Sequence, residues 1–338
     1  MTYHAFQVRG ERQFELVEKD LRPPRSGEVR VRVLSCGVCH SDVLAVEGQR
    51  PDPDEPVVPG HEAVGTVDAV GTDVTGWAVG DRVGVGFLGG PCHQCEPCRR
   101  GDFVNCTDQP LTGTSVDGGY AEVLYVRASG LVRVPAELDP LLAAPLLCAG
   151  ITTANGLRAA GAAPGALVGV QGLGGLGHLG VQYAKKLGHR VAVITRGSEK
   201  RQLAADLGGD HYIDSLSQDP AAALRELGGA AAILATAASG TAMTGLLGGL
   251  RPHGALVVVG AAPDPVEVST ADLIFGSRRI IGSLTGSSIG NEDNMAFSMS
   301  AGIMPMIESM PFQRAPEAYE RMMSGQARFR VVLDFTHS

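Results

Sequence analysis

The chain has 338 residues, of which 44% are hydrophobic and 19% are charged, and its formal net charge is −8. The length predicts two domains, because single hydrophobic cores rarely grow beyond about 250–300 residues. The negative charge argues against a nucleic-acid or anionic-membrane partner, since both attract basic surfaces. The N-terminal sequence carries no apolar signal region, and no apolar run approaches the roughly 20 residues that span a bilayer. We therefore expect a cytoplasmic protein without a membrane partner.

The first part of the chain, up to about residue 145, reads as short strands separated by turns. The stretches EVRVRVLSCG, AVGTVDAVG, DRVGVGF and AEVLYVRA are rich in β-branched residues and are bounded by Gly, Pro or Asp. This pattern predicts a compact β barrel or sandwich.

The seven cysteines favour metal binding over disulfides, because thiols of a reducing compartment rarely pair. Four of them follow C-x2-C-x2-C-x7-C spacing within residues 92–106 and match a closed tetrahedral zinc site, which would hold a loop that lacks its own core. The four are Cys92, Cys95, Cys98 and Cys106. His93 lies in the same loop, and we expect it to be solvated because four sulfurs complete the shell.

Further possible ligands are scattered along the chain. They are Cys36, Cys39, His40, His61, Glu62 and Cys148. Two cysteines and one histidine with an open fourth position would form a catalytic zinc site. Sequence distance cannot show that these residues converge, and composition alone favours a structural role over a ligand role for each of them.

From about residue 150 the chain alternates strands and helices. The apolar runs ALVGVQG, RVAVIT, AAILATA and GALVVVG are separated by helical stretches such as LGHLGVQYAKKLG and SEKRQLAADLG. This alternation predicts an α/β fold with a doubly wound parallel sheet covered on both faces. After about residue 285 come two helix-like stretches, NEDNMAFSMSAG and RAPEAYERMMSG, and a final strand, RFRVVLDF. Periodicity does not assign this tail to either half.

A glycine-rich turn, VQGLGGLG, follows the first of these strands and opens a helix. It carries Gly172, Gly174 and Gly177 in G-x-G-x-x-G spacing, with Gly175 inside the motif. The first two glycines permit a tight turn and close approach of a pyrophosphate, and the third allows close packing of helix on strand. The strand–turn–helix context indicates a dinucleotide site.

The end of the next strand bears on the choice of cofactor. NAD enzymes usually carry an acidic residue there. Here Thr195 takes that position in VITRGSEKR and is followed by Arg196, Ser198, Lys200 and Arg201. Hydroxyls and a guanidinium bind a 2′-phosphate that a carboxylate would repel. We expect NADP(H) in preference to NAD(H); the alternative is a solvated basic turn in an NAD enzyme.

Taken together, CGVCHSD, PGHEAVG, the four-cysteine loop, PLLCAGITT and the glycine-rich turn occur in the order found in zinc-dependent medium-chain alcohol dehydrogenases, which the chain resembles over its whole length. The tail GSLTGS…EAYERMMSGQARFRVVLDF resembles the cinnamyl-alcohol-dehydrogenase-like branch. The resemblance implies a GroES-like β-rich catalytic domain over 1–148 and 285–338, and a Rossmann domain over 149–284. It also implies a cofactor in the cleft between the domains, and a homodimer or homotetramer formed partly by edge strands of the cofactor domain.

Carried over by position, the resemblance makes Cys39, His61 and Cys148 the catalytic zinc ligands. Glu62 would be a neighbouring carboxylate that can approach the metal. Asp42 would accept a hydrogen bond from His61 and orient its ring, as zinc-bound imidazoles require.

The same resemblance assigns roles to nearby residues. Ser41 would hydrogen-bond the substrate oxygen and pass its proton. In many relatives a histidine at the position of Leu44 continues that proton path, and a leucine cannot carry a proton. His40 and Arg330 match family contacts to the cofactor pyrophosphate. Cys36 falls outside the ligand set, as a buried thiol.

The implied activity is hydride transfer between NADP(H) and a primary alcohol or aldehyde, with zinc as a Lewis acid. An alternative is reduction of an iminium or activated C=C bond on the same scaffold, although Ser41 favours the carbonyl reaction. A lesser alternative is a non-catalytic dinucleotide-binding protein, against which the complete zinc set argues. Phe87 and Leu88 suggest an apolar or aromatic substrate tail, or else they fill the barrel core.

Overall fold

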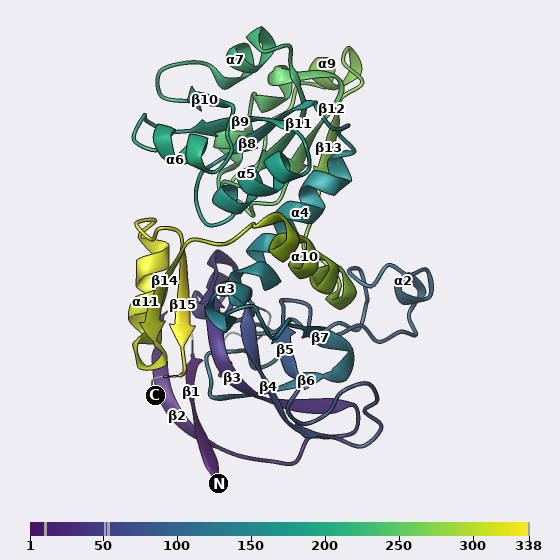
Figure 1. Cartoon of the computed structure of the whole chain (residues 1–338), viewed down its shortest axis with the longest axis vertical. Helices are drawn as coiled ribbons and strands as arrows, with labels where there is room; N and C mark the ends of the chain where they lie inside the picture. Colours follow the sequence, from purple (N-terminus) through teal and green to yellow (C-terminus); the bar gives the residue numbers. More distant parts are fainter. Residues whose placement is uncertain (10–11, 51, 53–54, 337–338) are drawn as a thin grey trace. The chain divides into compact units, whose positions relative to one another are not determined.

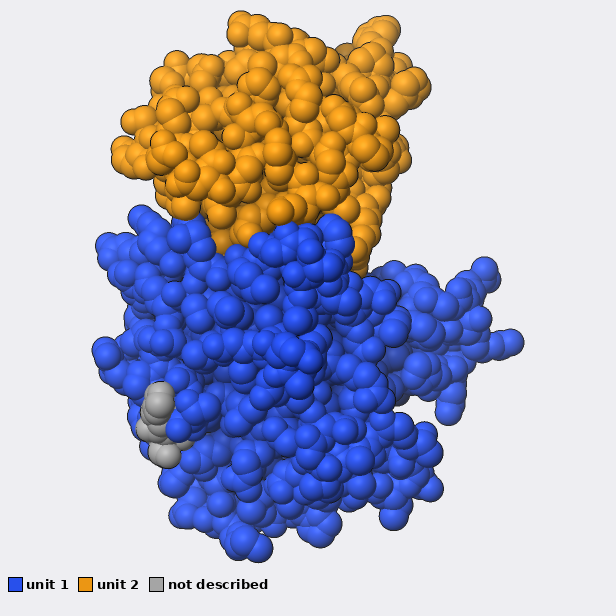
Figure 2. All heavy atoms as spheres, in the orientation of Figure 1, with its two compact units in different colours: residues 1–148, 286–338 blue, residues 149–285 orange. Residues whose placement is uncertain are grey.

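Two structural units make up the chain in the computed structural model, which describes residues 1–9, 12–50, 52 and 55–336. Unit 1 comprises Met1–Cys148 and Gly286–Ser338, and unit 2 comprises Ala149–Thr285 (Figure 2). Among the described residues, no single helix is long and apolar enough to cross a membrane.

Unit 1 is built on a seven-stranded sheet in which all neighbours are antiparallel except β14 and β15 (Figure 1). The order is β14-β15-β3-β4-β5-β7, and β6 also pairs with β3. The strands are β3 (Glu28–Val38), β4 (Ala63–Val70), β5 (Arg82–Val85), β6 (Val123–Arg127), β7 (Leu131–Arg133), β14 (Ile307–Pro311) and β15 (Arg330–Asp334). A separate hairpin joins β1 (Thr2–Val8) to β2 (Phe14–Asp20). The prediction of a β-rich first part is confirmed.

Strand β3 organises this unit. Its first three valines are buried and alternate with less buried charged residues, and from Ser35 to Cys39 every residue is buried. The last strand, β15, pairs with β3 and sets Leu333 opposite Cys36. The C-terminal segment, with α10 (Ser288–Ala301) and α11 (Ala315–Met323), belongs to unit 1, and its strand β15 lies beside the end of β3.

Unit 2 contains a six-stranded sheet in which every pair is parallel, in the order β10-β9-β8-β11-β12-β13 (Figure 1). The strands are β8 (Leu167–Gln171), β9 (Arg190–Thr195), β10 (His211–Asp214), β11 (Ala230–Ala235), β12 (Leu250–Val258) and β13 (Arg279–Gly282). Strands β8 and β11 are buried along their whole length, which requires cover on both faces. The order reverses between β8 and β11, which confirms the predicted doubly wound sheet.

The helices of unit 2 connect these parallel strands. They are α4 (Ala149–Ala160), α5 (Gly177–Lys186), α6 (Arg201–Asp206), α7 (Pro220–Glu226), α8 (Gly240–Met243) and α9 (Thr270–Ile274). Helix α5 starts just after the glycine-rich turn, at the carboxyl end of β8. In open parallel sheets, ligands bind at this edge beside the point where the strand order reverses.

Candidate active site

Four of the scattered residues converge in unit 1. One ligand atom from each of Cys39, His61, Glu62 and Cys148 lies within 4.8 Å of the other three. Cys39 follows the end of β3, His61 and Glu62 precede β4, and Cys148 follows the short helical segment Ala144–Leu147. The Sγ atoms of Cys39 and Cys148 are 3.9 Å apart. Two zinc–sulfur bonds of about 2.3 Å at a tetrahedral angle put the sulfurs about 3.8 Å apart, so this pair fits a zinc ion.

The two thiols of this cluster do not titrate alike. Contact with the Cys148 sulfur lowers the pKa of Cys39 well below its usual value, against the effect of burial. The same contact, together with burial, raises the pKa of Cys148. A metal that binds both sulfurs as thiolates would displace the protons that the thiols carry without it.

A buried hydrogen-bond network orients His61. The Oδ1 atom of Asp42 lies 2.9 Å from Nδ1 of His61. The Oδ2 atom of Asp42 accepts hydrogen bonds from the backbone N–H of Cys39 and from the hydroxyl of Tyr120, each at 2.9 Å. Among the described residues, Nε2 of His61 has no hydrogen-bond partner. With Nδ1 held by a carboxylate, Nε2 is the nitrogen available to a metal, as metal-bound histidines usually require.

Charge in this network also acts on the histidine. Burial disfavours the imidazolium, but the charges of Asp42 and Cys39 outweigh burial and raise the pKa of His61 well above its usual value. Burial raises the pKa of the Tyr120 hydroxyl, and the Asp42 charge raises it further, so Tyr120 stays a neutral donor. Tyr120 could not be predicted from the sequence, because no spacing motif connects it to the ligands.

Glu62 forms an ion pair inside the same cluster. Its Oε1 atom accepts a hydrogen bond from Nη2 of Arg330, the first residue of β15. Glu62 is 0% exposed and Arg330 is 4% exposed. Burial raises the pKa of Glu62 to about 7, although the Arg330 charge acts in the opposite direction. Both residues could be named from the sequence but their pairing could not, and the expected contact of Arg330 with the cofactor pyrophosphate stays a prediction.

The remaining predicted residues of unit 1 lie close along the chain. His40 and Ser41 begin a single helical turn, His40–Asp42; His40 is exposed and Ser41 is half-buried. Leu44 is half-buried on α1 (Val43–Val46). Cys36 is fully buried, as predicted. The Phe87 ring meets the His61 ring edge-on, with centroids 5.2 Å apart.

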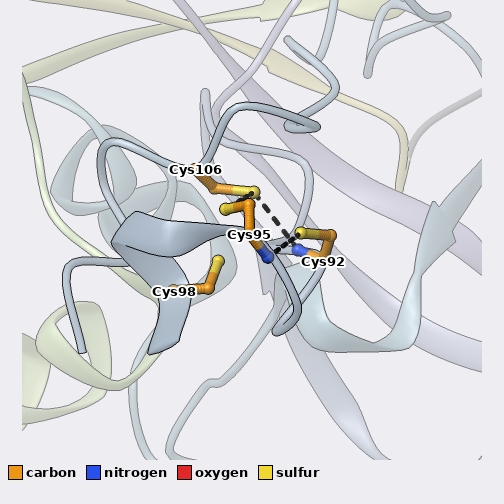
Figure 3. Close-up of side chains that lie close together, drawn as sticks. All are labelled: Cys92, Cys95, Cys98 and Cys106. Atoms are coloured by element: carbon orange, nitrogen blue, oxygen red, sulfur yellow. Dashed lines mark hydrogen bonds between the residues drawn. The ribbon is translucent and has the colours of Figure 1, made fainter. Parts of the chain in front are cut away.

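The four-cysteine loop forms the second cluster of unit 1, and its side chains turn toward one another (Figure 3). The Sγ atoms of Cys95 and Cys106 are 3.8 Å apart, which again fits two zinc–sulfur bonds. Backbone N–H groups of Gln94 and Cys95 donate to the Cys92 sulfur at 3.5 and 3.4 Å. Hydrogen bonds from the backbone N–H groups of Cys98 and Thr107 lower the pKa of Cys95 to about 6.

The loop folds around these sulfurs with little secondary structure of its own. It contains the one-turn helix α2 (Glu96–Arg99). His93 is exposed and is not part of the cluster, as expected.

In unit 2, each predicted glycine of the turn is a glycine for a different structural reason. Gly172 has φ of +93°, which favours glycine. A Cβ on Gly177 would overlap the carbonyl oxygen of Gly172, so the helix can approach the strand only without a side chain. A Cβ on Gly174 would have no atom within 4 Å. Gly174 therefore faces open space that a phosphate could occupy, and Gly175 follows it in the same turn.

The loop after β9 holds the other predicted cofactor residues. Thr195 ends the strand and is half-buried, whereas Arg196 and Ser198 are exposed. The Nζ atom of Lys200 donates to the carbonyl oxygen of Leu173 at 2.8 Å, and so ties this loop to the glycine-rich turn.

A carboxylate does lie near this loop, on the neighbouring strand β10. The Oδ1 atom of Asp214 accepts hydrogen bonds from the backbone N–H groups of Leu216 and Gly197, at 2.9 and 2.8 Å. These bonds lower the pKa of Asp214. This carboxylate is therefore engaged in holding the backbone of the two loops.

Comparisons with known proteins agree with this architecture. Residues 25–136 match the family described as "Alcohol dehydrogenase GroES-like domain", and residues 175–303 match "Zinc-binding dehydrogenase". The alcohol dehydrogenase notN of Aspergillus sp. (strain MF297-2) is 40% identical over 313 residues, which cover 93% of this chain and 92% of the relative. The chain belongs to the zinc-type alcohol dehydrogenase superfamily. Its general activity is that of an oxidoreductase of the alcohol dehydrogenase type.

Solved structures of this superfamily have the same fold. The cinnamyl alcohol dehydrogenase SbCAD4 from Sorghum bicolor superimposes with a TM-score of 0.89 at 34% identity, over 99% of this chain and 98% of that one. The CAD from Helicobacter pylori complexed with NADP(H) gives a TM-score of 0.87 at 29% identity, over 100% and 99% of the two chains. These matches confirm the resemblance to the cinnamyl-alcohol-dehydrogenase-like branch, and the GroES-like and Rossmann folds.

Proposed function

We propose that this alcohol dehydrogenase uses zinc and prefers NADP(H), and that it transfers a hydride between the cofactor and a primary alcohol or aldehyde. The observation that carries the proposal is the buried set of Cys39, His61 and Cys148 with Asp42 behind the histidine. Three ligands of these types are the usual complement of a catalytic zinc site with an open position. A zinc ion held there would supply Lewis-acid chemistry to a substrate oxygen.

The residues around this set orient a ligand and bind the substrate. Asp42 holds the His61 ring so that Nε2 faces the sulfurs. Ser41, two residues after Cys39, is the group that would hydrogen-bond the substrate oxygen and hold its proton. A protein that only bound a dinucleotide would need no such buried donor set, which speaks against the non-catalytic alternative.

Leu44 is the reason to keep a second candidate function. Its aliphatic side chain ends the proton path that a histidine would continue, and reduction of an iminium or activated C=C bond would make that path less important. Leu44→His tests the point, because it should raise aldehyde turnover only if proton transfer limits the rate. An unchanged rate and pH profile would show that this position does not limit the reaction.

The NADP(H) preference rests on the loop after β9. Thr195, Arg196 and Ser198 offer hydroxyls and a guanidinium where NAD enzymes usually carry an acid. The Helicobacter pylori relative was solved with NADP(H), whereas the acetophenone reductase from Geotrichum candidum was solved with NAD, so the preference depends on the loop of this chain.

A substitution at Thr195 tests this preference. Thr195→Asp should shift the ratio of kcat/KM values from NADPH toward NADH, because its carboxylate repels a 2′-phosphate. Thr195→Ser is the matched control, since it keeps the hydroxyl. If the ratio is the same in both variants, the cofactor proposal is wrong.

The second cluster is proposed as a structural zinc site, formed by Cys92, Cys95, Cys98 and Cys106. Four sulfur ligands leave no open position for a substrate. With the first cluster this amounts to two zinc ions per chain.

We also propose a homo-oligomer, joined through the edge of unit 2. Strand β13 ends the sheet there, and Ile280 on it is exposed. Ile274, Phe275 and Leu284 flank the strand, and Phe275 is 90% exposed. An open strand edge with exposed apolar side chains favours pairing with a second copy. Ile280→Lys should lower the mass measured by light scattering; an unchanged mass would argue against this edge.

The activity itself is tested by NADPH oxidation with benzaldehyde or cinnamaldehyde, with and without a chelator. We expect turnover that the chelator abolishes. Protein with two bound zinc ions that turns over no member of a broad aldehyde panel would contradict the carbonyl reaction and favour the second candidate.

A further inference from the structure

Gly37, on strand β3 beside the proposed zinc ligands, has no backbone reason to be a glycine. Its φ is not among the positive values, and it pairs with Val332 of β15 in regular antiparallel register. Any residue could adopt this backbone. The reason must lie in what a side chain would meet.

The space that a side chain at position 37 would take is filled by Glu62. The three atoms nearest to a Cβ built on Gly37 all belong to the Glu62 side chain: Oε2, which it would overlap, and Cβ and Cδ, each at 3.0 Å. The backbone N–H of Gly37 also donates to the carbonyl oxygen of Glu62 at 3.0 Å, so the two residues are locked together. Gly37 therefore provides the space for this carboxylate.

The Glu62 carboxylate can contact either of two neighbours: Arg330 or a metal held by the other ligands. In the present position, Oε1 pairs with Arg330 and Oε2 lies against Gly37 without a hydrogen-bond partner among the described residues. Yet one of its oxygens lies within 4.8 Å of the ligand atoms of Cys39, His61 and Cys148. A carboxylate oxygen is an acceptable zinc ligand at about 2.0–2.2 Å, so a small movement would add Glu62 to the donor set.

We propose that Gly37 is a positioning residue that keeps Glu62 on Arg330 and out of the zinc ligand set. The inference rests on the proposed zinc site and explains how its fourth position stays open. A side chain at position 37 would displace the carboxylate from its present place. Because Glu62 is fully buried, water cannot take over the solvation of the displaced oxygen, and a metal cation held by the neighbouring ligands is a group that can satisfy it. A fourth protein ligand would close the site to substrate.

The test uses the full chain loaded with cobalt(II), whose visible spectrum reports its ligands, and imidazole as a small probe of the open position. In the wild type, imidazole should change the spectrum of the Cys39 site. Gly37→Ala should raise the imidazole concentration needed by about 10- to 100-fold, the usual range for changes around a metal site. Cobalt in the four-cysteine cluster should not respond in either protein, and serves as an internal control.

The double variant Gly37→Ala/Glu62→Ala separates this role from general damage. Because it removes the displaced carboxylate, it should bind imidazole at nearly the concentration that Glu62→Ala alone requires, a reference that carries the same loss of the Arg330 pair. Rescue of folding by the double variant, where Gly37→Ala alone does not fold, equally places the conflict at Glu62. The proposal is overturned if Gly37→Ala binds imidazole like the wild type, or if the double variant is as impaired as the single one.

If the proposed zinc site itself were wrong, the same experiment would give a different result. Wild-type protein whose Cys39-site cobalt ignores imidazole would show that no open position exists, which contradicts the proposed function itself. A wild type that responds, with a Gly37→Ala variant that responds equally, contradicts only the role of Gly37.

Discussion

The two clusters of unit 1 reach similar sulfur–sulfur distances by opposite routes. In the loop, all four ligands come from residues 92–106, and the hydrogen bonds to their sulfurs come from nearby backbone N–H groups. In the other cluster, Cys39 and Cys148 are 109 residues apart, and the neighbours are charged: Asp42, Glu62 and Arg330.

This difference separates what a metal would do in each place. Among the described residues of the loop, only the ligands Cys98 and Cys106 are buried, so a metal there would replace a core that the loop lacks. The buried cluster sits at the end of β3 and is already held by the sheet and by the Asp42–Tyr120 network. A metal there would contribute to catalysis rather than to the stability of the fold.

The largest expected effect comes from removing a ligand of the buried cluster. Cys148→Ala should lower aldehyde turnover by about 1,000-fold or more, because Lewis-acid stabilisation is worth several kcal/mol and each 1.36 kcal/mol is tenfold in rate. Its thermal unfolding, followed by circular dichroism, should change little. Retention of turnover would remove the buried cluster from the mechanism.

Metal removal should act on the loop in the opposite sense. Arg99 and Arg100 are exposed trypsin sites within it. Treatment with a chelator should speed cleavage there by about 100-fold or more, since metal binding and folding are coupled in such loops. Fragment masses identify the cut. Cys148→Ala, untreated, should be cut no faster than the wild type; equal protection with and without chelator would contradict a structural metal.

A smaller effect is expected from the partner of His61. Asp42→Asn keeps the shape of the side chain but weakens its hold on the imidazole. It should lower zinc affinity at the buried cluster by about 10- to 100-fold, as changes behind metal ligands usually do. Competition with a chromophoric chelator measures both sites in one titration. The affinity of the four-cysteine cluster is the internal control, and a loss shared by both clusters would count against this assignment.

The smallest effect concerns Tyr120, which acts on the ligands only through Asp42. Tyr120→Phe removes one hydrogen bond, worth about 1 kcal/mol, and should weaken zinc binding by about fivefold in the same titration. A loss as large as that of Asp42→Asn would mean that Tyr120 holds more of the cluster than its single hydrogen bond indicates.

The contrast also explains what could be predicted from the sequence. The four-cysteine loop and the G-x-G-x-x-G turn are local, so spacing indicated the first, and spacing together with the strand–turn–helix context indicated the second. Strands such as β3 and β8 were predicted from their runs of β-branched residues. Strand β2 was not, because FELVEKD mixes charged and apolar residues and is only partly buried.

The buried cluster was within reach only through the family resemblance. Nothing local connects Cys39 to Cys148, and the pairing of Glu62 with Arg330 spans 268 residues. That pair exists because β15 lies beside β3 in one particular register, which periodicity does not reveal. Tyr120 was missed for the same reason. The space at Gly37 is visible only once the neighbouring side chain is in place.

The contrast between the two clusters predicts that the buried one holds a separate, catalytic zinc ion. The most direct measurement is the zinc content of the wild type, Cys148→Ala and Cys98→Ala, taken together with the aldehyde turnover of each. We predict two zinc ions per chain in the wild type, from its two clusters, and one in each variant. Turnover per folded protein should be lost only in Cys148→Ala. A Cys148→Ala variant that keeps both zinc ions, or that keeps one with full turnover, would contradict the claim.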